Sequence, residues 1–599
     1  MRFPSITTLA DRAREVALRF PWTVACGIAA AVFAIVATTK TGQGDQWLRA
    51  SGAAALGLPL TVALTLFAEE RGWSAGKKAI LNLGGLALLV LFYLIWRGPD
   101  RKHEAIRYFQ LSAGLHLLVA TLPFLGQPES NGFWQYNRRL FLGFLRALVF
   151  SMVLFNGLAV ALLALDKLFG VHVPSELYFR LYLVTVFVIN TAIFLAAVPE
   201  RLTGLASDSS YPRVLKVFAQ YILTPLVFIY LIILLAYLVK IVFGGEWPSG
   251  WIGWLVTSVA VAGLLGFLLV HPLRHDPGEA WIRTYTRWLF IGLIPAAVVL
   301  LVAFWKRVLP YGLTELRLLG VLLGLWLLAI AVNYKLNPET GIRRIPVTLA
   351  GLLLLTLYGP LSVTRFSVAS QGRRLAHLVA APRENQPPSG DRNAREASSA
   401  LRFLLEHGAR RQIAAAIPGS RPVTDWDSAA LNREKLDSAA TQILAVANMR
   451  YVPRYSEGSE GYFSLWAQPE ALTPIAGYDW MIRVSQDGGS SVVVGKDTVG
   501  KGPIVVGPDT LAVTFDSQAG VLQLIAAGDS LAFDLGTLAK AAADSPARYQ
   551  VPAQRLQVRL SGRSRKAMLV LESISGKRSA ADSLTIDRWQ GKLFFGATD

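Results

Sequence analysis

The feature that most constrains the fold is an apolar run from Leu140 to Leu165 with charged residues at both ends. Arg138 and Arg139 precede the run, and an acid and a base follow it. A helix needs about 20 apolar residues to cross the roughly 30 Å hydrocarbon core of a bilayer. Only a helix satisfies its own backbone hydrogen bonds there. The run therefore predicts a membrane-spanning helix, with the aromatic residues before the arginines at headgroup level.

Apolar runs of similar length recur along the first three fifths of the chain. With 53% hydrophobic and 17% charged residues, the composition is not that of a soluble protein. We predict an all-α transmembrane bundle of about eleven spans, at 21–38, 51–68, 79–96, 108–125, 140–165, 178–198, 217–239, 251–270, 288–305, 316–333 and 346–363. The runs 51–68 and 108–125 are short and contain polar residues, and loss of either would change the side on which the chain leaves the membrane.

Hydrophobic periodicity and composition divide the chain into four parts. Residues 1–20 include an amphipathic helix, Ser5 to Phe20, which we expect to lie on the membrane surface. Residues 21–365 form the predicted transmembrane domain, and 366–393, rich in Pro, Gly and polar residues near its end, form a linker. Residues 394–599 predict a soluble α+β domain, with helices at 394–416, 428–447 and 535–543 among short alternating runs typical of strands.

The basic charge belongs to the membrane half. Residues 1–365 contain 32 Lys and Arg against 17 Asp and Glu. These cations flank apolar runs, which is the pattern of topology signals and of contacts with anionic lipids at the basic loop ends, and it argues against nucleic acid as a partner. The loop charges favour a cytoplasmic N-terminus in a bacterial inner membrane, although a cluster at Arg97, Arg101, Lys102 and Arg107 opposes this orientation. Eleven spans would then place the C-terminal domain outside the cytoplasm.

Motifs for catalysis, cofactors or metals are weak, and none is predicted as a site. Gly495 to Gly502 fits a phosphate loop in part, but glycine and proline follow its lysine where Ser or Thr would hold magnesium. His271 and His275 are spaced by four residues, but a mixed-charge loop explains them better than a metal site. The single cysteine, Cys26, excludes intrachain disulfides.

Polar residues inside apolar runs are costly and are therefore candidates for function. Arg146 and His116 are the ionisable residues that fall inside predicted spans, and Asn156 and Asn190 add neutral polar groups. We predict these four as a candidate intramembrane polar site. The guanidinium of Arg146 could instead extend back to the interface, and the asparagines could hydrogen-bond between helices. The middles of the spans contain no Asp or Glu of the kind that proton-coupled carriers use.

Four stretches carry a resemblance to a known family. They are 133–170, 211–240, YGLTELR at 311–317 and YGPLSVTRFSVASQGRRL at 358–375, and together they extend over most of residues 1–375. In content and order they resemble DUF4153, a family of bacterial polytopic inner-membrane proteins of unassigned function. The resemblance implies a multi-pass membrane protein and no catalytic residues.

Three functions remain open. We favour a non-enzymatic envelope protein that presents an extracytoplasmic domain for a ligand or protein partner. The first alternative is a transporter or lipid-handling permease, which a polar cavity at mid-membrane would favour. The second alternative is a membrane-embedded enzyme acting on lipid-linked substrates, in which Arg146, Arg283 and Arg287 could contact phosphates.

Overall fold

The computed structural model divides the chain into two compact units. It describes all residues except 1–5, 40–43, 99–100, 128–130, 203, 245–250, 381–391, 421–432, 453–460, 469–474, 488–491, 495–496, 500–503, 507–508, 517–519, 527, 544–549, 579–583 and 599. The first unit, called the membrane unit, comprises 1–380 and 400–448, and the second, called the β unit, comprises 381–399 and 449–599. The predicted division at 365 and 393 differs from this one, because the helices in 400–448 pack within the membrane unit.

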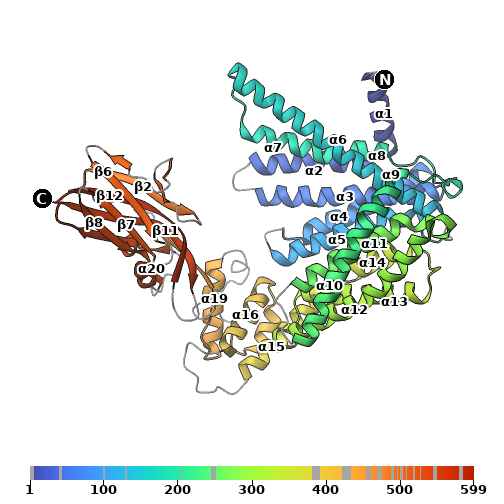
Figure 1. Ribbon diagram of the computed structural model, residues 1–599. Coiled ribbons are helices and arrows are strands. Elements are labelled where there is room, and N and C mark those ends of the chain that lie inside the picture. Colours follow the sequence, from blue (N-terminus) through green and yellow to red (C-terminus); the bar gives the residue numbers. More distant parts are fainter. Residues whose placement is uncertain are drawn as a thin grey trace. The chain divides into compact units, whose positions relative to one another are not determined.

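The described elements of the membrane unit are helices joined by turns and loops (Figure 1). Its first fourteen α-helices are α1 Ile6–Arg19, α2 Pro21–Thr39, α3 Gly44–Glu70, α4 Ala75–Ile95, α5 Lys102–Thr121, α6 Asn131–Phe169, α7 Ser175–Val184, α8 Asn190–Ala196, α9 Arg213–Phe218, α10 Thr224–Gly244, α11 Trp251–Val270, α12 Ala280–Tyr311, α13 Glu315–Leu336 and α14 Arg344–Leu355. Short π-helical turns join α7 to α8 and α9 to α10. The predicted amphipathic helix near the N-terminus is confirmed as α1.

Nine helical stretches among the described residues are long and apolar enough to cross a membrane. Two further helices, α5 and α14, lie where the fourth and eleventh spans were predicted, and with them about eleven spans is plausible. These two helices run antiparallel to each other. Near one end of the pair Gln110 Nε2 donates to the carbonyl of Leu353 at 2.7 Å, and near the other Arg343 donates to the carbonyl of Phe124 at 2.9 Å. Helix α14 ends earlier than predicted, before a turn that contains Gly359 at φ +80°.

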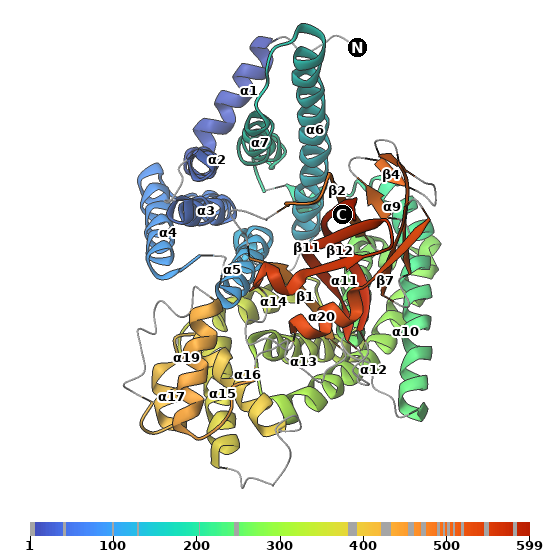
Figure 2. The same cartoon turned by 90° about the vertical axis from the view of Figure 1, so that its left-hand side faces the viewer.

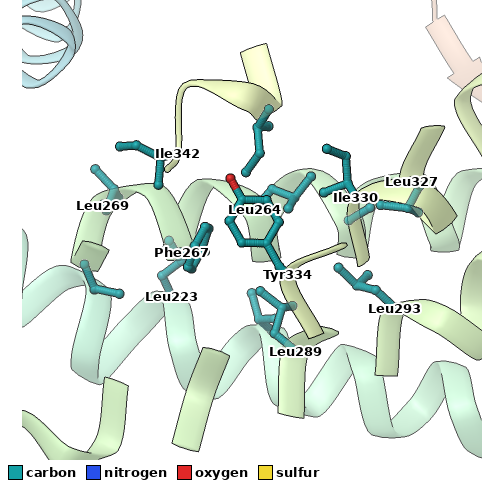
Figure 3. Packing of buried hydrophobic residues seen from close by; sticks show 14 of the residues in the cluster. Leu223, Leu264, Phe267, Leu269, Leu289, Leu293, Leu327, Ile330, Tyr334 and Ile342 are labelled. Carbon is teal, nitrogen blue, oxygen red and sulfur yellow. The ribbon is translucent and has the colours of Figure 1, made fainter. Parts of the chain in front are cut away.

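The bundle core is apolar and closely packed. Phe267, Phe290 and Tyr334 come from three different helices and form a ring cluster with centroids 5.0–5.2 Å apart. Figure 3 shows Phe267 and Tyr334 among the leucines and isoleucines of this core. Gly320 and Gly324 of α13, spaced as GxxxG, lie directly against side chains of α12: a Cβ added to Gly320 would lie 2.1 Å from the ring of Phe304. The glycine pair therefore allows close packing of helices, as such spacing often does.

A group of helices at one end of the bundle forms what we call the cap: α15 Val363–Ala380, residues 400–406 of α16 Arg392–Glu406, α17 Arg410–Ala416 and α19 Arg433–Val446 (Figure 2). The sequence predicted a single helix over 394–416. Gly408 interrupts it at φ +61°, a left-handed conformation that commonly ends helices. The cap lies at the end of the bundle where helices α5 and α13 begin. We call this end the cap end. The opposite end, where Arg19 of α1 binds Glu69 at 2.8 Å, is called the α1 end.

The β unit packs two sheets against each other, in which neighbouring strands are antiparallel except for the parallel pair β1 and β9. Its strands are β1 Gly461–Ala467, β2 Trp480–Asp487, β3 Val492–Val494, β4 Asp497–Val499, β5 Ile504–Val506, β6 Asp509–Asp516, β7 Val521–Ala526, β8 Asp529–Asp534, β9 Gln550–Val551, β10 Gln557–Ser561, β11 Arg565–Arg578 and β12 Leu584–Ala597. The larger sheet has the order β4-β3-β2-β12-β11-β1-β9 with β10 on β11, and the smaller has β5-β6-β7-β8. One apolar cluster includes Val484 and Ile574 of the larger sheet, Phe515 and Leu524 of the smaller, and Leu535 of the helix α20 Leu535–Ala543.

The C-terminal region contains both helices and strands, as predicted, and α20 has the predicted bounds. Strand β1 was not predicted. The part of the phosphate-loop-like motif that the structure describes is strand β4, and the remainder of that motif lies outside the described residues.

Candidate functional site

Five ionisable side chains meet at the cap end of the membrane unit, and we call them the polar junction. His103, Glu104 and Arg107 lie in the first turns of α5. Glu315 is the first residue of α13, and His407 directly follows the last residue of α16. The side chains of His103, Glu104, Glu315 and His407 are each at most 7% exposed. Buried charges need partners, so their contacts determine what the site can do.

His407 and Glu315 hold one proton between them. The Nδ1 atom of His407 lies 2.6 Å from the carbonyl oxygen of Phe403, which can only accept, so Nδ1 must carry hydrogen. The Nε2 atom contacts Oε1 of Glu315. A carboxylate there requires an imidazolium, and a neutral imidazole requires a carboxylic acid. In both cases one proton lies between Nε2 of His407 and Oε1 of Glu315, in addition to the hydrogen on Nδ1.

His103 stacks on His407, with ring centroids 4.3 Å apart. Its Nε2 lies 3.4 Å from Oε1 of Glu104, and the same oxygen accepts from Nη1 of Arg107 at 3.1 Å. The other oxygen of Glu104 is buried without a hydrogen-bond partner among the described residues. Arg107 also donates to the Thr364 hydroxyl at 3.3 Å. The junction thus joins α5 and α13 to the first helix of the cap and to the end of α16.

Burial and neighbouring charges shift the ionisation of the α5 residues. Burial lowers the pKa of His103, and positive charge at His407 and Arg107 lowers it further, against the opposing effect of Glu104. Burial alone would raise the pKa of Glu104, but the hydrogen bond with His103 and the charge of Arg107 outweigh this effect, and the net pKa lies below the usual value. The lowered pKa favours the neutral form of His103, which adds no positive charge next to His407 and Arg107.

A second set of contacts next to the junction uses a backbone carbonyl group. The carbonyl oxygen of Tyr311 accepts from Gln371 at 3.0 Å and from Arg374 and Arg317 at 3.1 Å each. Gln371 also donates to the carbonyl of Leu313 at 2.9 Å. These residues belong to 311–317 and 358–375, two of the stretches that carry the family resemblance. The short turn between α12 and α13 is therefore fastened to α15 of the cap.

The four residues predicted as an intramembrane polar site make local contacts. His116 Nδ1 lies 2.8 Å from the carbonyl of Ser112, Arg146 Nε donates to that of Leu142 at 3.3 Å, and Asn156 Nδ2 to that of Met152 at 2.7 Å. Each of these carbonyls lies four residues earlier in the same helix, and no contact joins one of the four residues to another. Asn190 is the first residue of α8, after the π-helical turn. A shared site for His116, Arg146, Asn156 and Asn190 stays a prediction without a contact to support it.

Sequence reasoning did not find the polar junction. His103 and His407 were two of seven scattered histidines, and the partners His407 and Glu315 are 92 residues apart in the chain. One signal was present: Glu315 stands immediately before an apolar run, inside the stretch YGLTELR. A carboxylate at the start of a membrane span needs a cationic partner near the membrane interface. The sequence does not identify which residue is that partner.

Two apolar cavities of the membrane unit lie away from the junction. The larger, of about 560 Å³, lies between α2, α3 and α4; alanines line it, together with Trp22, Phe33, Trp47 and Tyr93. The smaller, of about 400 Å³, lies between α6 and α7, and Arg180 is its one charged lining residue. None of the four predicted polar residues lines either cavity.

The described residues include no group of three or more His, Cys, Asp or Glu side chains arranged to hold a metal ion. The spaced pair His271 and His275 is engaged by one arginine. Arg274 lies 2.8 Å from the Nε2 atom of each ring and 3.0 Å from Glu339. These contacts connect neighbouring loops at the α1 end.

Comparison with known proteins gives a family and one distant relative. The model of a family described as "Domain of unknown function (DUF4153)" matches residues 25–385, which include four of the five junction residues but not His407. An uncharacterised protein of Pasteurella multocida (strain Pm70) is 24% identical over 271 residues, which is 44% of this chain and 44% of that protein. The match therefore spans less than half of the relative's length. No solved structure matches the chain.

Proposed function

Since the chain belongs to the DUF4153 family of uncharacterised multi-pass membrane proteins, we propose a function from its own residues: a non-enzymatic protein of the bacterial inner membrane that presents the β unit, outside the cytoplasm, to a binding partner. The observation that supports this proposal most is the polar junction. Its buried ionic groups connect α5 and α13 of the bundle to the cap, so they serve to hold helices together. The larger part of the β unit, residues 449–599, follows the cap in the chain.

The β unit exposes large apolar side chains that a partner could cover. Ile475, Trp480 and Met481 are 53%, 44% and 51% exposed, and all three lie within or just before strand β2. Successive residues of a strand point to opposite faces, so Trp480 and Met481 present apolar surface on both sides of the sheet. Large apolar side chains exposed on one strand are candidates for contact with a partner.

Site-specific photo-crosslinking tests the partner. A photoreactive residue is placed at Met481 in the full chain expressed in cells, with Gln590 as an exposed polar control on the neighbouring strand β12. We expect a discrete protein adduct from position 481 and no adduct from position 590. Equal adducts from both positions, or none from position 481, would contradict the proposal.

Cysteine labelling tests the orientation. In a Cys26→Ser background, new cysteines replace exposed Thr537 in the β unit or exposed Lys77 in the first turn of α4 at the α1 end. A membrane-impermeant maleimide added to intact spheroplasts should label position 537 and not position 77. Labelling of position 77 alone would reverse the proposed orientation.

Lipid handling is the second candidate, and the cavity of about 560 Å³ between α2, α3 and α4 favours it. Its floor of small alanine side chains and its aromatic walls would accommodate an acyl chain. The full-length protein in proteoliposomes tests this candidate, with scrambling of a fluorescent phospholipid as the measurement. Scrambling above that of empty vesicles, abolished by Ala53→Trp in the cavity, would replace the anchor proposal.

A further inference from the structure

The smaller cavity of the membrane unit is an aliphatic groove with one cation in it. Leu158 to Leu165 of α6 and Leu177 to Val184 of α7 line it, and Arg180 is the charged residue among five leucines, an alanine and a valine. The groove lies next to the tip of the α6–α7 hairpin, where Gly170 adopts φ +67° just after α6.

Arg180 lacks a protein counter-ion. Among the described residues no hydrogen bond or ion pair joins it to a carboxylate, and this includes Glu176, one turn earlier on the same helix face. Its Nε atom is buried without a hydrogen-bond partner. A guanidinium against apolar surface is costly unless an anion pairs with it.

The position of the groove along α6 indicates which anion is near. Arg139, at the other end of the helix, binds Asp208 at 3.1 Å and marks one edge of the hydrocarbon core. Leu158 follows Arg139 by 19 residues, or about 29 Å at 1.5 Å per residue. The hydrocarbon core is about 30 Å thick, and the headgroups extend it to about 40–45 Å. The groove therefore begins near the opposite edge of the core, where phospholipid phosphates lie.

We propose that the groove between α6 and α7 is a binding site for one anionic phospholipid, with an acyl chain between the leucines and the phosphate on Arg180. The aliphatic lining requires an apolar occupant at a depth where the surroundings are polar headgroups. Arginine binds phosphate through paired, charge-assisted hydrogen bonds, which suits it to this place. This proposal concerns the bundle and is independent of the function proposed for the β unit.

Native mass spectrometry of the full-length protein tests the site, with phosphatidylglycerol and phosphatidylcholine as the two probes. Arg180→Gln removes the charge and Ala161→Trp fills the groove while keeping Arg180. Arg146→Gln is the matched control, because Arg146 is an arginine of the neighbouring helix α6 that lines neither cavity. We expect the wild type and the control to retain phosphatidylglycerol at delipidating detergent concentrations. Arg180→Gln should bind it about tenfold more weakly, which is the scale of losing one hydrogen bond to a charged group. Ala161→Trp should weaken binding to a similar degree, because the larger side chain occupies the space of the acyl chain.

Three outcomes would overturn the proposal. Equal retention of phosphatidylglycerol by Arg180→Gln and by Arg146→Gln would mean that Arg180 holds no phosphate. Undiminished retention by Ala161→Trp would mean that the groove holds no acyl chain. Equal retention of phosphatidylcholine and phosphatidylglycerol by the wild type would remove the preference for an anionic lipid. Because Ala161→Trp leaves the charge in place, its result remains informative if Arg180→Gln does not fold.

Discussion

The two ends of the membrane unit use ionic contacts in different ways. At the α1 end, Arg19 and Glu69 are each about one fifth exposed, and Arg139, which pairs with Asp208, is 41% exposed. At the cap end, the side chains of His407 and Glu315 are 5% and 6% exposed. Exposed pairs contribute little to stability because water and salt screen them, whereas removal of one partner from a buried pair leaves an uncompensated charge. We therefore expect the cap end to be much more sensitive to substitution.

Arg107→Ala should produce the largest effect. It leaves the carboxylate of Glu104 buried, with the His103 ring as its neighbour but without a cation, and should lower the free energy of unfolding by about 3–5 kcal/mol. Arg274→Ala at the α1 end is the matched control and should cost about 0–1 kcal/mol, because its partner Glu339 is 74% exposed. Equilibrium unfolding in mixed micelles measures both values. Losses of equal size would remove the difference between the two ends.

The His407 and Glu315 pair should show strong coupling in a double-mutant cycle. With Glu315→Gln and His407→Gln, singly and together, we expect an interaction energy of about 0.5–3 kcal/mol, because each single change leaves the other group without its proton-sharing partner. The cycle of Arg274 and Glu339 is the comparison, since Glu339 is 74% exposed. If the two cycles give the same coupling, burial does not distinguish the ends.

Stability at the cap end should fall as the pH is lowered below about 6.5. The pKa of His103 is lowered from 6.5 in the folded protein, so the unfolded chain binds more protons between the lowered pKa and 6.5. The stability that comes from keeping His103 neutral is complete above this window and is lost as the pH falls through it. Glu104, whose pKa is lowered from 4.5, contributes in a lower range. The other charged and titratable groups near the His103 ring are His407, Glu315 and Arg107.

Unfolding midpoints between pH 5 and 8 measure this effect. His103→Gln should flatten the pH dependence, because the titrating group is removed. Asp208→Asn at the α1 end should leave the dependence between pH 5 and 8 unchanged, because hydrogen bonds from Ser210 and Arg139 lower the pKa of Asp208 to about 2. An unaltered slope in His103→Gln would show that another group controls it.

Arg139→Ala should have the smallest effect, within about 0.5 kcal/mol. Its partner Asp208 keeps a contact with Arg138 at 3.4 Å and a bond from the backbone N–H of Ser210 at 3.0 Å. The same unfolding assay measures the change. A loss above about 2 kcal/mol would mean that the ion pairs of the α1 end act as a network rather than as separate exposed pairs.

Much of the architecture was predictable because it depends on local composition. Apolar runs long enough to cross a bilayer must form helices there, so the spans follow from sequence, as does the helix at Leu535 to Ala543. Helix ends were less predictable, because they depend on single residues such as Gly408, whose left-handed conformation divides α16 from α17. The placement of the cap helices within the membrane unit depends on packing and could not be predicted from composition.

The amino-acid sequence by itself determined that this protein is a helical membrane bundle followed by a region of α+β texture, because hydrophobicity and its period act over neighbouring residues. The tertiary structure alone decided which polar residues meet. His103, Glu315 and His407 come together across hundreds of residues, and Arg180 lies against leucines from another helix. The charges of these residues affect stability and binding because they are buried and have specific neighbours. Burial and neighbours both arise only when distant segments pack together.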